Sequence, residues 1–139
     1  MNVQPSVMMA FACESVTIEP GKPTSFNNVL DGIEAADFPA PTGRWFAIFC
    51  FYSPSEGGIG NCRVVVTHES GEVVAQTAVK SLTFTEHNPI SRNVVNFQGL
   101  AWPYPGWYSV KFVAERDSVL ATFPMLVQLA ASAVNAEAD

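Results

Sequence analysis

The sequence has few charged residues, and its basic residues are dispersed. Charged residues make up 14% of the 139 residues, against roughly 25% in an ordinary soluble domain. Seven Lys and Arg stand singly against thirteen Asp and Glu, which gives a net charge of −6. Nucleic-acid binding normally needs a basic stripe that displaces counterions from several phosphates, so this composition argues against a nucleic-acid partner. The absence of a polybasic cluster argues equally against a membrane-surface site.

Long apolar runs and an export signal are also lacking. No apolar segment approaches the roughly 18 residues that a membrane-spanning helix needs. The stretch Met1 to Ser6 has neither the positive charges nor the continuous apolar core of a signal peptide, so we expect a cytoplasmic protein. The three cysteines, Cys13, Cys50 and Cys62, are odd in number and unrelated in spacing. We expect buried free thiols, with a Cys50–Cys62 bridge across a hairpin as the alternative.

What the chain does contain is apolar: 48% of its residues are hydrophobic, including ten Phe, three Trp and three Tyr. That content excludes intrinsic disorder. A chain of this length can bury enough surface to fold without a disulfide or a metal. We therefore expect one domain over residues 1–128. The Ala-rich segment 129–139 is expected to be a frayed tail or a short helix.

Ten Pro and nine Gly divide the chain into short segments with an apolar period of two. In the last hairpin, for example, Tyr108, Val110 and Phe112 alternate with more polar neighbours. Such spacing predicts an all-β fold, a two-layer antiparallel β-sandwich of the immunoglobulin-like kind. The expected strands are Val7–Cys13, Val16–Ile18, Thr24–Leu30, Gly32–Phe38, Arg44–Tyr52, Cys62–His68, Val73–Val79, Leu82–Thr85, Val94–Phe97, Trp107–Glu115 and Val119–Val127, with a flexible loop over Ser53–Asn61.

The Arg44–Tyr52 strand is apolar on both faces. One face carries Trp45, Ala47, Phe49 and Phe51, and the other carries Phe46, Ile48, Cys50 and Tyr52. A half-buried antiparallel strand should have one polar face, so the second face needs a cover. Either the tail or a loop covers it, or it is buried against another subunit. The second possibility predicts a homo-oligomer, most simply a two-fold dimer, with the candidate interface Phe46, Ile48 and Tyr52.

No catalytic constellation is present. His68 and His87 belong to no zinc-binding or triad motif, and we expect both to be surface-loop histidines. Three carboxylates, Asp31, Glu34 and Asp37, offer oxygen ligands for Ca2+, but their spacing does not match a calcium loop. We expect them to be solvated edge charges. The sequence thus predicts a protein that is not an enzyme and has no metal or cofactor.

An aromatic group lies between Trp102 and Tyr108. Exposed Trp102, Tyr104 and Trp107 at a sandwich rim would form a platform for a sugar or another small ligand, stiffened by the intervening prolines. The alternative is structural. The Pro105-Gly106 entry to a late strand with Tyr108 is similar to the tyrosine corner of immunoglobulin-like sandwiches, whose phenol bonds to nearby backbone. A partner contact is the third possibility.

Three segments together carry a family resemblance: Cys13 with the following Val16-Thr17-Ile18, Phe38-Pro39 before the apolar strand, and Pro105 to Val110 continuing through Leu120 to Pro124. They resemble a widespread group of small bacterial proteins of unknown function. The resemblance covers roughly residues 7 to 128. It implies a single immunoglobulin-like β-sandwich and no activity, cofactor or site residue.

Two functions fit these observations. The first is a non-enzymatic interaction or structural module that self-associates through the outer face of the Arg44–Tyr52 sheet. The second is a carbohydrate- or small-ligand-binding sandwich that uses Trp102, Tyr104 and Trp107.

Overall fold

The computed structural model describes residues 4–41 and 43–130. Its strands are β1 (Ser6–Thr17), β2 (Ser25–Leu30), β3 (Gly32–Ala35), β4 (Ala40–Pro41), β5 (Trp45–Tyr52), β6 (Gly57–Ile59), β7 (Arg63–His68), β8 (Val73–Ala78), β9 (Leu82–Phe84), β10 (Ile90–Phe97), β11 (Ala101–Trp102), β12 (Gly106–Ala114) and β13 (Ser118–Leu129). A single 3-10 turn, η1 (Glu115–Asp117), joins the last two. Within the described ranges no helix is long and apolar enough to cross a membrane. The expected tail helix lies almost wholly outside them.

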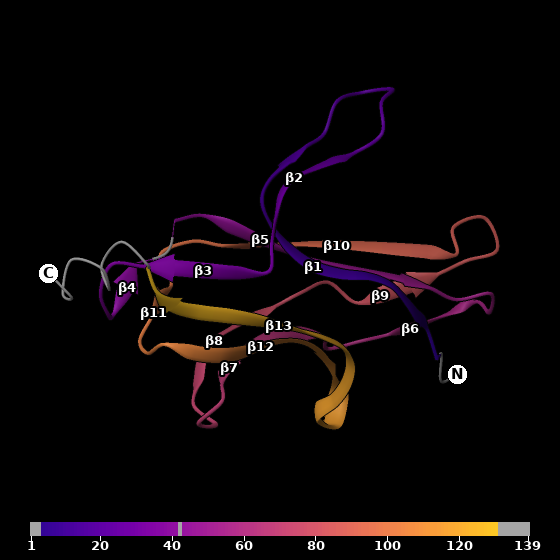
Figure 1. The fold of residues 1–139 in the computed structure, drawn as a ribbon. Helices are drawn as coiled ribbons and strands as arrows, with labels where there is room; N and C mark the ends of the chain where they lie inside the picture. Colours follow the sequence, from indigo (N-terminus) through magenta and orange to yellow (C-terminus); the bar gives the residue numbers. More distant parts are fainter. Residues whose placement is uncertain (1–3, 42, 131–139) are drawn as a thin grey trace, which may run out of the picture.

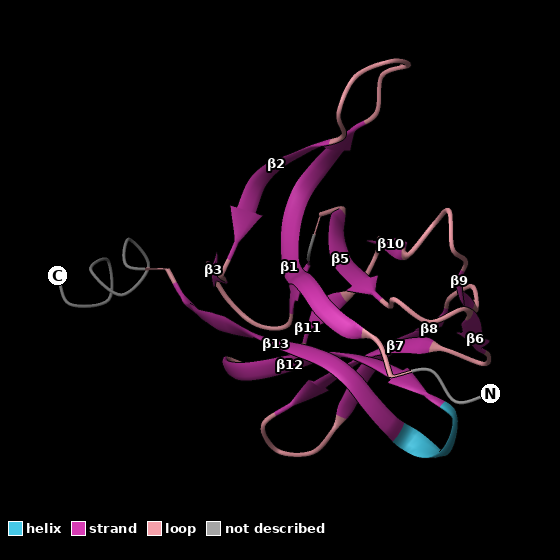
Figure 2. Ribbon diagram, turned by 90° about the vertical axis from the view of Figure 1, so that its right-hand side faces the viewer, coloured by secondary structure: helices cyan, strands magenta, loops and turns pink. Residues whose placement is uncertain are grey.

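Two sheets form the layers of a sandwich (Figure 2). The first, here called the β5 sheet, has the strand order β10-β5-β1-β2. The second, the β12 sheet, has the order β3-β13-β12-β7-β8. Their pairings are antiparallel except for β13 with β3, which is parallel. The fold is therefore the two-layer antiparallel sandwich of immunoglobulin-like kind that the sequence predicts.

The main core lies between the sheets. From β5 it takes the face that carries Trp45, Ala47, Phe49 and Phe51. The opposing Phe112 ring of β12 lies 5.3 Å from the Phe49 ring and 4.9 Å from the Phe51 ring. The predicted alternation along β12 is confirmed, because Tyr108, Val110, Phe112 and Ala114 are all buried in this core. Burial of aromatic rings of this size is the largest stabilising contribution to such a sandwich.

The outer face of β5 is covered by the chain itself. Ile48 and Cys50 are 0% and 1% exposed and form a second cluster with Cys13. The side chains packed over this cluster come largely from β1 and β2: Phe11, Val16 and Phe26, together with Phe46. The hairpin that these two strands form extends away from both sheets at its tip (Figure 1). Near its start β2 is tied back to β10 by a hydrogen bond of 2.9 Å from Arg92 Nη1 to Thr24 Oγ1.

Several predicted boundaries were wrong. β1 runs unbroken over Ser6–Thr17, where two strands were expected. β10 begins at Ile90, four residues before the predicted start at Val94. The loop Ser53–Asn61 is not wholly irregular, because β6 pairs within it with β9. In each case a pairing with a distant strand extends the element beyond what the local apolar pattern indicates.

The chain passes from the β5 sheet to the β12 sheet through Asp31, which separates β2 from β3. At the start of β3, Gly32 lies against β13: an added Cβ would be 2.8 Å from the carbonyl oxygen of Leu126. The Leu126 N–H donates to the Asp31 carbonyl at 3.4 Å. The chain therefore crosses at a glycine, because a side chain at position 32 would collide with the backbone of Leu126.

Gly32→Ala should lower the free energy of unfolding by about 1–3 kcal/mol, because backbone on both strands must shift to admit the methyl group. Denaturant unfolding measures this loss. Gly43→Ala is the matched control, since nothing lies within 4 Å of a Cβ added there. Equal stability of the two variants would contradict the close approach of β3 to β13.

Candidate functional site

The Tyr108 phenol closes a corner at the entry to β12. Its hydroxyl donates to the Tyr104 carbonyl oxygen at 2.6 Å and accepts from the Tyr104 N–H at 3.2 Å. The side chain is 1% exposed, and this burial raises the pKa of the phenol. These bonds to backbone four residues upstream are those of a tyrosine corner. The structural interpretation of Tyr108 is therefore confirmed.

His68 is part of the same corner, and its prediction as a surface-loop residue was wrong. It is 8% exposed, and its ring lies 4.8 Å from the ring of Tyr108. The Ser70 N–H donates to Nδ1 at 3.2 Å, so Nε2 carries the proton that is donated to the Pro105 carbonyl at 3.0 Å. Both ring nitrogens are thus used to hold two turns together. His87 is exposed in a turn, as predicted.

The structure separates the three aromatic residues of the predicted ligand rim. Trp102 is 0% exposed and stacks on Trp45, with ring centroids 5.8 Å apart, so it cannot serve as a platform. The Nε1–H groups of both indoles are buried without a hydrogen-bond partner among the described residues. Tyr104 is 43% exposed, and its hydroxyl donates to Glu72 at 3.4 Å. Only Trp107, which is 50% exposed, lines a cavity.

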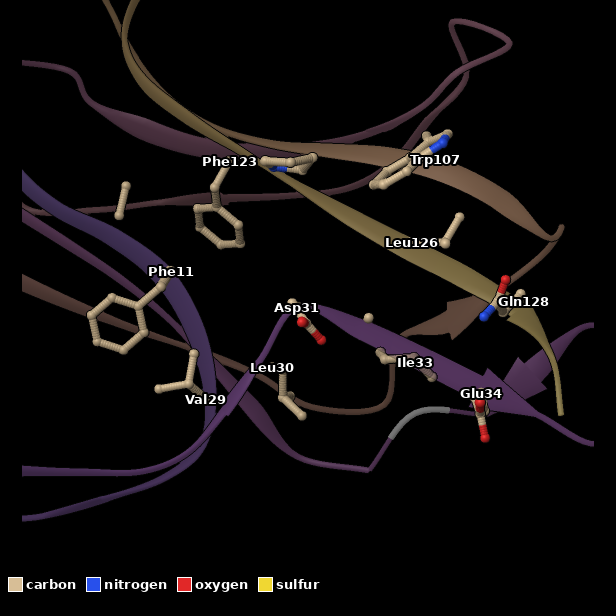
Figure 3. Close-up of a pocket in the computed structure, with 13 residues that line it drawn as sticks. Phe11, Val29, Leu30, Asp31, Ile33, Glu34, Trp107, Phe123, Leu126 and Gln128 are labelled. Carbon is tan, nitrogen blue, oxygen red and sulfur yellow. The ribbon is translucent and has the colours of Figure 1, made fainter. Parts of the chain in front are cut away.

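That cavity, here called the wedge pocket, lies where the β5 sheet and the β12 sheet diverge (Figure 3). Its volume is about 700 Å3. Three chain segments build it: β1, the crossing from β2 to β3, and β13 with its neighbour β12. The lining residues are Ala10, Phe11, Val29, Leu30, Asp31, Gly32, Ile33, Glu34, Trp107, Phe123, Pro124, Leu126 and Gln128.

Sequence reasoning missed this pocket, although it singled out three of its residues. Trp107 was assigned to a rim with Trp102 and Tyr104, and Asp31 and Glu34 were treated as solvated edge charges. The pocket depends on the parallel pairing of β3 with β13, in which Gly32 lies opposite Leu126. A pairing between residues so far apart in the sequence leaves no local signal.

A second surface is the exposed part of the outer face of the β5 sheet. Cross-strand partners in a sheet share a face. The pairs of Ile90 with Tyr52 and of Val94 with Ile48 therefore bring side chains of β10 onto the outer face of β5. Met9 of β1 pairs with Cys50 on the same face. We call Met9, Tyr52, Ile90 and Val94, which are 37–42% exposed, the outer-face patch.

The predicted interface residues have separate environments. Ile48 is 0% exposed within the chain, so its side chain is not available to a partner, and this part of the prediction needs correction. Phe46 is partly buried against the second cluster, and the Arg44 guanidinium lies over its ring, 5.4 Å from the centroid of the Phe46 ring. Tyr52 remains at the surface, 40% exposed. The outer-face patch therefore shares Tyr52 with the predicted interface, and its other members are Met9, Ile90 and Val94.

The cysteines are buried free thiols, as predicted, and the alternative Cys50–Cys62 bridge is not formed. Burial raises the pKa of all three thiols, which disfavours the reactive thiolate. Across residues 4–41 and 43–130, no group of three or more His, Cys, Asp or Glu side chains is placed to hold a metal ion.

The sandwich and its tyrosine corner define an immunoglobulin-like β-sandwich. The chain belongs to DUF6941, a family of unknown function, whose sequence model matches residues 8–128. The predicted membership of a family without known function is thereby confirmed. Comparison with the curated proteins finds no match.

Among the solved structures that are similar to this chain are a DNA glycosylase and a CARDB domain. One is the Pseudomonas fluorescens alkylpurine DNA glycosylase AlkC, bound to DNA containing an abasic site analog, with a TM-score of 0.54 and 10% identity. The match covers 91% of this chain and 31% of the glycosylase, so this chain spans about a third of its length. The other is the CARDB domain of a Pyrococcus furiosus protein in complex with di-metal ions, with a TM-score of 0.43, 15% identity and coverage of 94% and 99%. At 10% identity the likeness to the glycosylase supports the fold alone.

Tyr108→Phe should lower the free energy of unfolding at neutral pH by about 1–2 kcal/mol, because both hydrogen bonds to Tyr104 are lost. The variant should also be less sensitive to alkali. With a raised pKa, native Tyr108 keeps its proton where the unfolded chain loses it, so wild-type stability falls as the pH rises above about 10. The variant has no phenol at this position to contribute to that fall.

Denaturant unfolding between neutral pH and pH values above 10 measures both effects. Tyr52→Phe is the matched control, since Tyr52 is 40% exposed, and its stability should stay within about 0.5 kcal/mol of wild type. Similar losses for the two variants would contradict a structural corner at Tyr108.

Proposed function

We propose that this chain is a non-enzymatic protein-interaction module that self-associates through the outer-face patch. The observation that carries this proposal is four apolar side chains, Met9, Tyr52, Ile90 and Val94, exposed on one sheet face around Arg92, which lies between Ile90 and Val94 on β10. Arg92 is the charged residue of β10 on this face, and its guanidinium donates to Thr24 Oγ1 at 2.9 Å. Apolar side chains gathered on an exposed sheet face are typical of protein–protein contacts.

The environments of the reactive side chains support a non-catalytic role. Both ring nitrogens of His68 are engaged, by Ser70 and by Pro105. The thiols are buried with raised pKa values. The net charge of −6 gives no support for binding DNA as the structurally similar glycosylase does. A cytoplasmic setting remains the expectation from the sequence.

The mass in solution tests self-association. Light scattering behind a sizing column, across a tenfold dilution, should give twice 15.0 kDa for the wild type. Val94→Glu should weaken the dimer about tenfold or more, because two-fold symmetry brings two buried carboxylates into one apolar contact. Ile90→Glu should act in the same way.

Val119→Glu is the control: Val119 is 50% exposed but lies on β13, away from the patch. It should leave the mass unchanged. A wild type that stays at 15.0 kDa at every concentration would contradict self-association. An equal effect of Val119→Glu would show that added negative charge, and not the patch, controls the mass.

Binding of a carbohydrate or another small ligand is a second candidate function, favoured by one observation. Trp107, an exposed member of the predicted rim, lines the 700 Å3 wedge pocket together with Phe11 and Phe123. Ligand pockets have this size and this share of aromatic lining.

Tryptophan fluorescence tests this candidate. Trp45 and Trp102 are 2% and 0% exposed, whereas Trp107 is 50% exposed, so a ligand in the wedge pocket should change the emission of Trp107. A panel of sugars and small amphiphiles should include at least one that gives a saturable change. That change should disappear in Trp107→Leu and persist in Tyr104→Leu, whose side chain lies outside the pocket. A panel without any response would contradict the candidate.

A further inference from the structure

The charged groups that line the wedge pocket all have the same sign. Asp31 and Glu34 contribute carboxylates and Gln128 an amide, while no Lys, Arg or His of the described chain is among the lining residues. Arg44 lines an adjoining cavity that shares Leu30, Gly32, Ile33 and Glu34 with the wedge pocket. A ligand that fills the wedge pocket therefore meets a negative potential.

These two carboxylates are free to bind. Among the described residues neither Asp31 nor Glu34 makes a side-chain hydrogen bond or an ion pair. Both side chains are exposed, so water solvates their charges and no buried partner is required. Figure 3 shows the Asp31 side chain between two walls of the pocket: β13 with Phe123 on one side, and β1 and β2 on the other.

Aromatic rings complete the lining. Phe11 comes from β1, Trp107 from β12 and Phe123 from β13, and all three line the same space. The face of an aromatic ring attracts a cation that lies within about 6 Å of its centroid, and indole does so most strongly. Rings and carboxylates in one cavity thus favour the same ligand charge, while the aliphatic lining favours an apolar body.

We infer that the wedge pocket binds an amphiphilic monocation: an apolar, aromatic or alkyl body that carries one ammonium group. This inference rests on the second candidate function and names its ligand class. The apolar body occupies the space near Phe11 and Phe123, and the ammonium group lies beside the Asp31 carboxylate, with Glu34 adding to the negative potential. A neutral sugar would donate hydroxyl hydrogen bonds to the carboxylates but would leave their charges uncompensated.

Three probes of one shape test the charge preference. Phenylpropylammonium is the cation, phenylpropanol its neutral counterpart and phenylpropanoate the anion. Each is titrated into the full 15N-labelled chain while the three indole N–H signals are followed by NMR, with the signal of Trp107 assigned from Trp107→Phe. The cation should shift the Trp107 signal saturably and leave those of the buried Trp45 and Trp102 in place.

The expected preference is about two- to fivefold in dissociation constant for the cation over the alcohol, as one exposed ion pair allows. The anion should bind more weakly than the alcohol. High salt should reduce the preference, because exposed charges are screened. In the double variant Asp31→Asn, Glu34→Gln the cation should bind with a dissociation constant near that of the alcohol.

Asp37→Asn is the matched control, since Asp37 is an exposed carboxylate in the same segment but does not line the pocket. It should keep the full preference. Equal binding of cation and alcohol by the wild type would overturn the cation inference and leave small-ligand binding in place. If no probe shifts the Trp107 signal, or if the signals of Trp45 and Trp102 move instead, the inference is overturned, while the second candidate function is decided by the panel of sugars and amphiphiles.

Discussion

The architecture depends on the need to cover β5 on both faces. Its inner row, from Trp45 to Phe51, packs against the β12 sheet, as any sandwich strand would. Its outer row includes Ile48 and Cys50, which water would otherwise reach, and the chain meets that need with its own β1–β2 hairpin. In this arrangement β2 is the edge strand of the β5 sheet. From that edge the chain crosses to the β12 sheet and continues there as β3. The wedge pocket is a consequence of that crossing.

The corner around Tyr108 fixes the residue at which β12 begins. Tyr108 and His68 hold the turns at Tyr104 and Pro105 by hydrogen bonds to backbone. The tight approach at Gly106, whose φ is +126°, leaves an added Cβ only 3.0 Å from His68 Nε2. This rigid entry sets the register in which Trp107 lies opposite Leu126, on the edge of the pocket. Structural and candidate binding residues thus alternate along one strand.

The sequence predicted the sandwich, the two-sided character of β5 and the Tyr108 corner, because each depends on residues close together in the chain. It did not predict what covers Ile48, since the covering Phe26 belongs to a hairpin whose curvature has no local signature. The burial of His68 was missed for a related reason: its partner, the Pro105 carbonyl, lies 37 residues away. Trp102 was assigned to a rim from its place beside Tyr104 and Trp107 in a Pro-rich segment, whereas its stacking on Trp45 is a tertiary contact. The wedge pocket needs three distant segments and could not be read from any one of them.

The parallel pairing of β3 with β13 also has a consequence for how the chain folds. Gly32 lies in an early strand and its partner Leu126 in the last described one, so this pairing carries a high entropic cost of loop closure. During synthesis from the N-terminus, β3 has no strand beside it until β13 has left the ribosome. The wedge pocket is consequently assembled only after β13 emerges, and a shorter nascent chain would display an open sheet edge in its place.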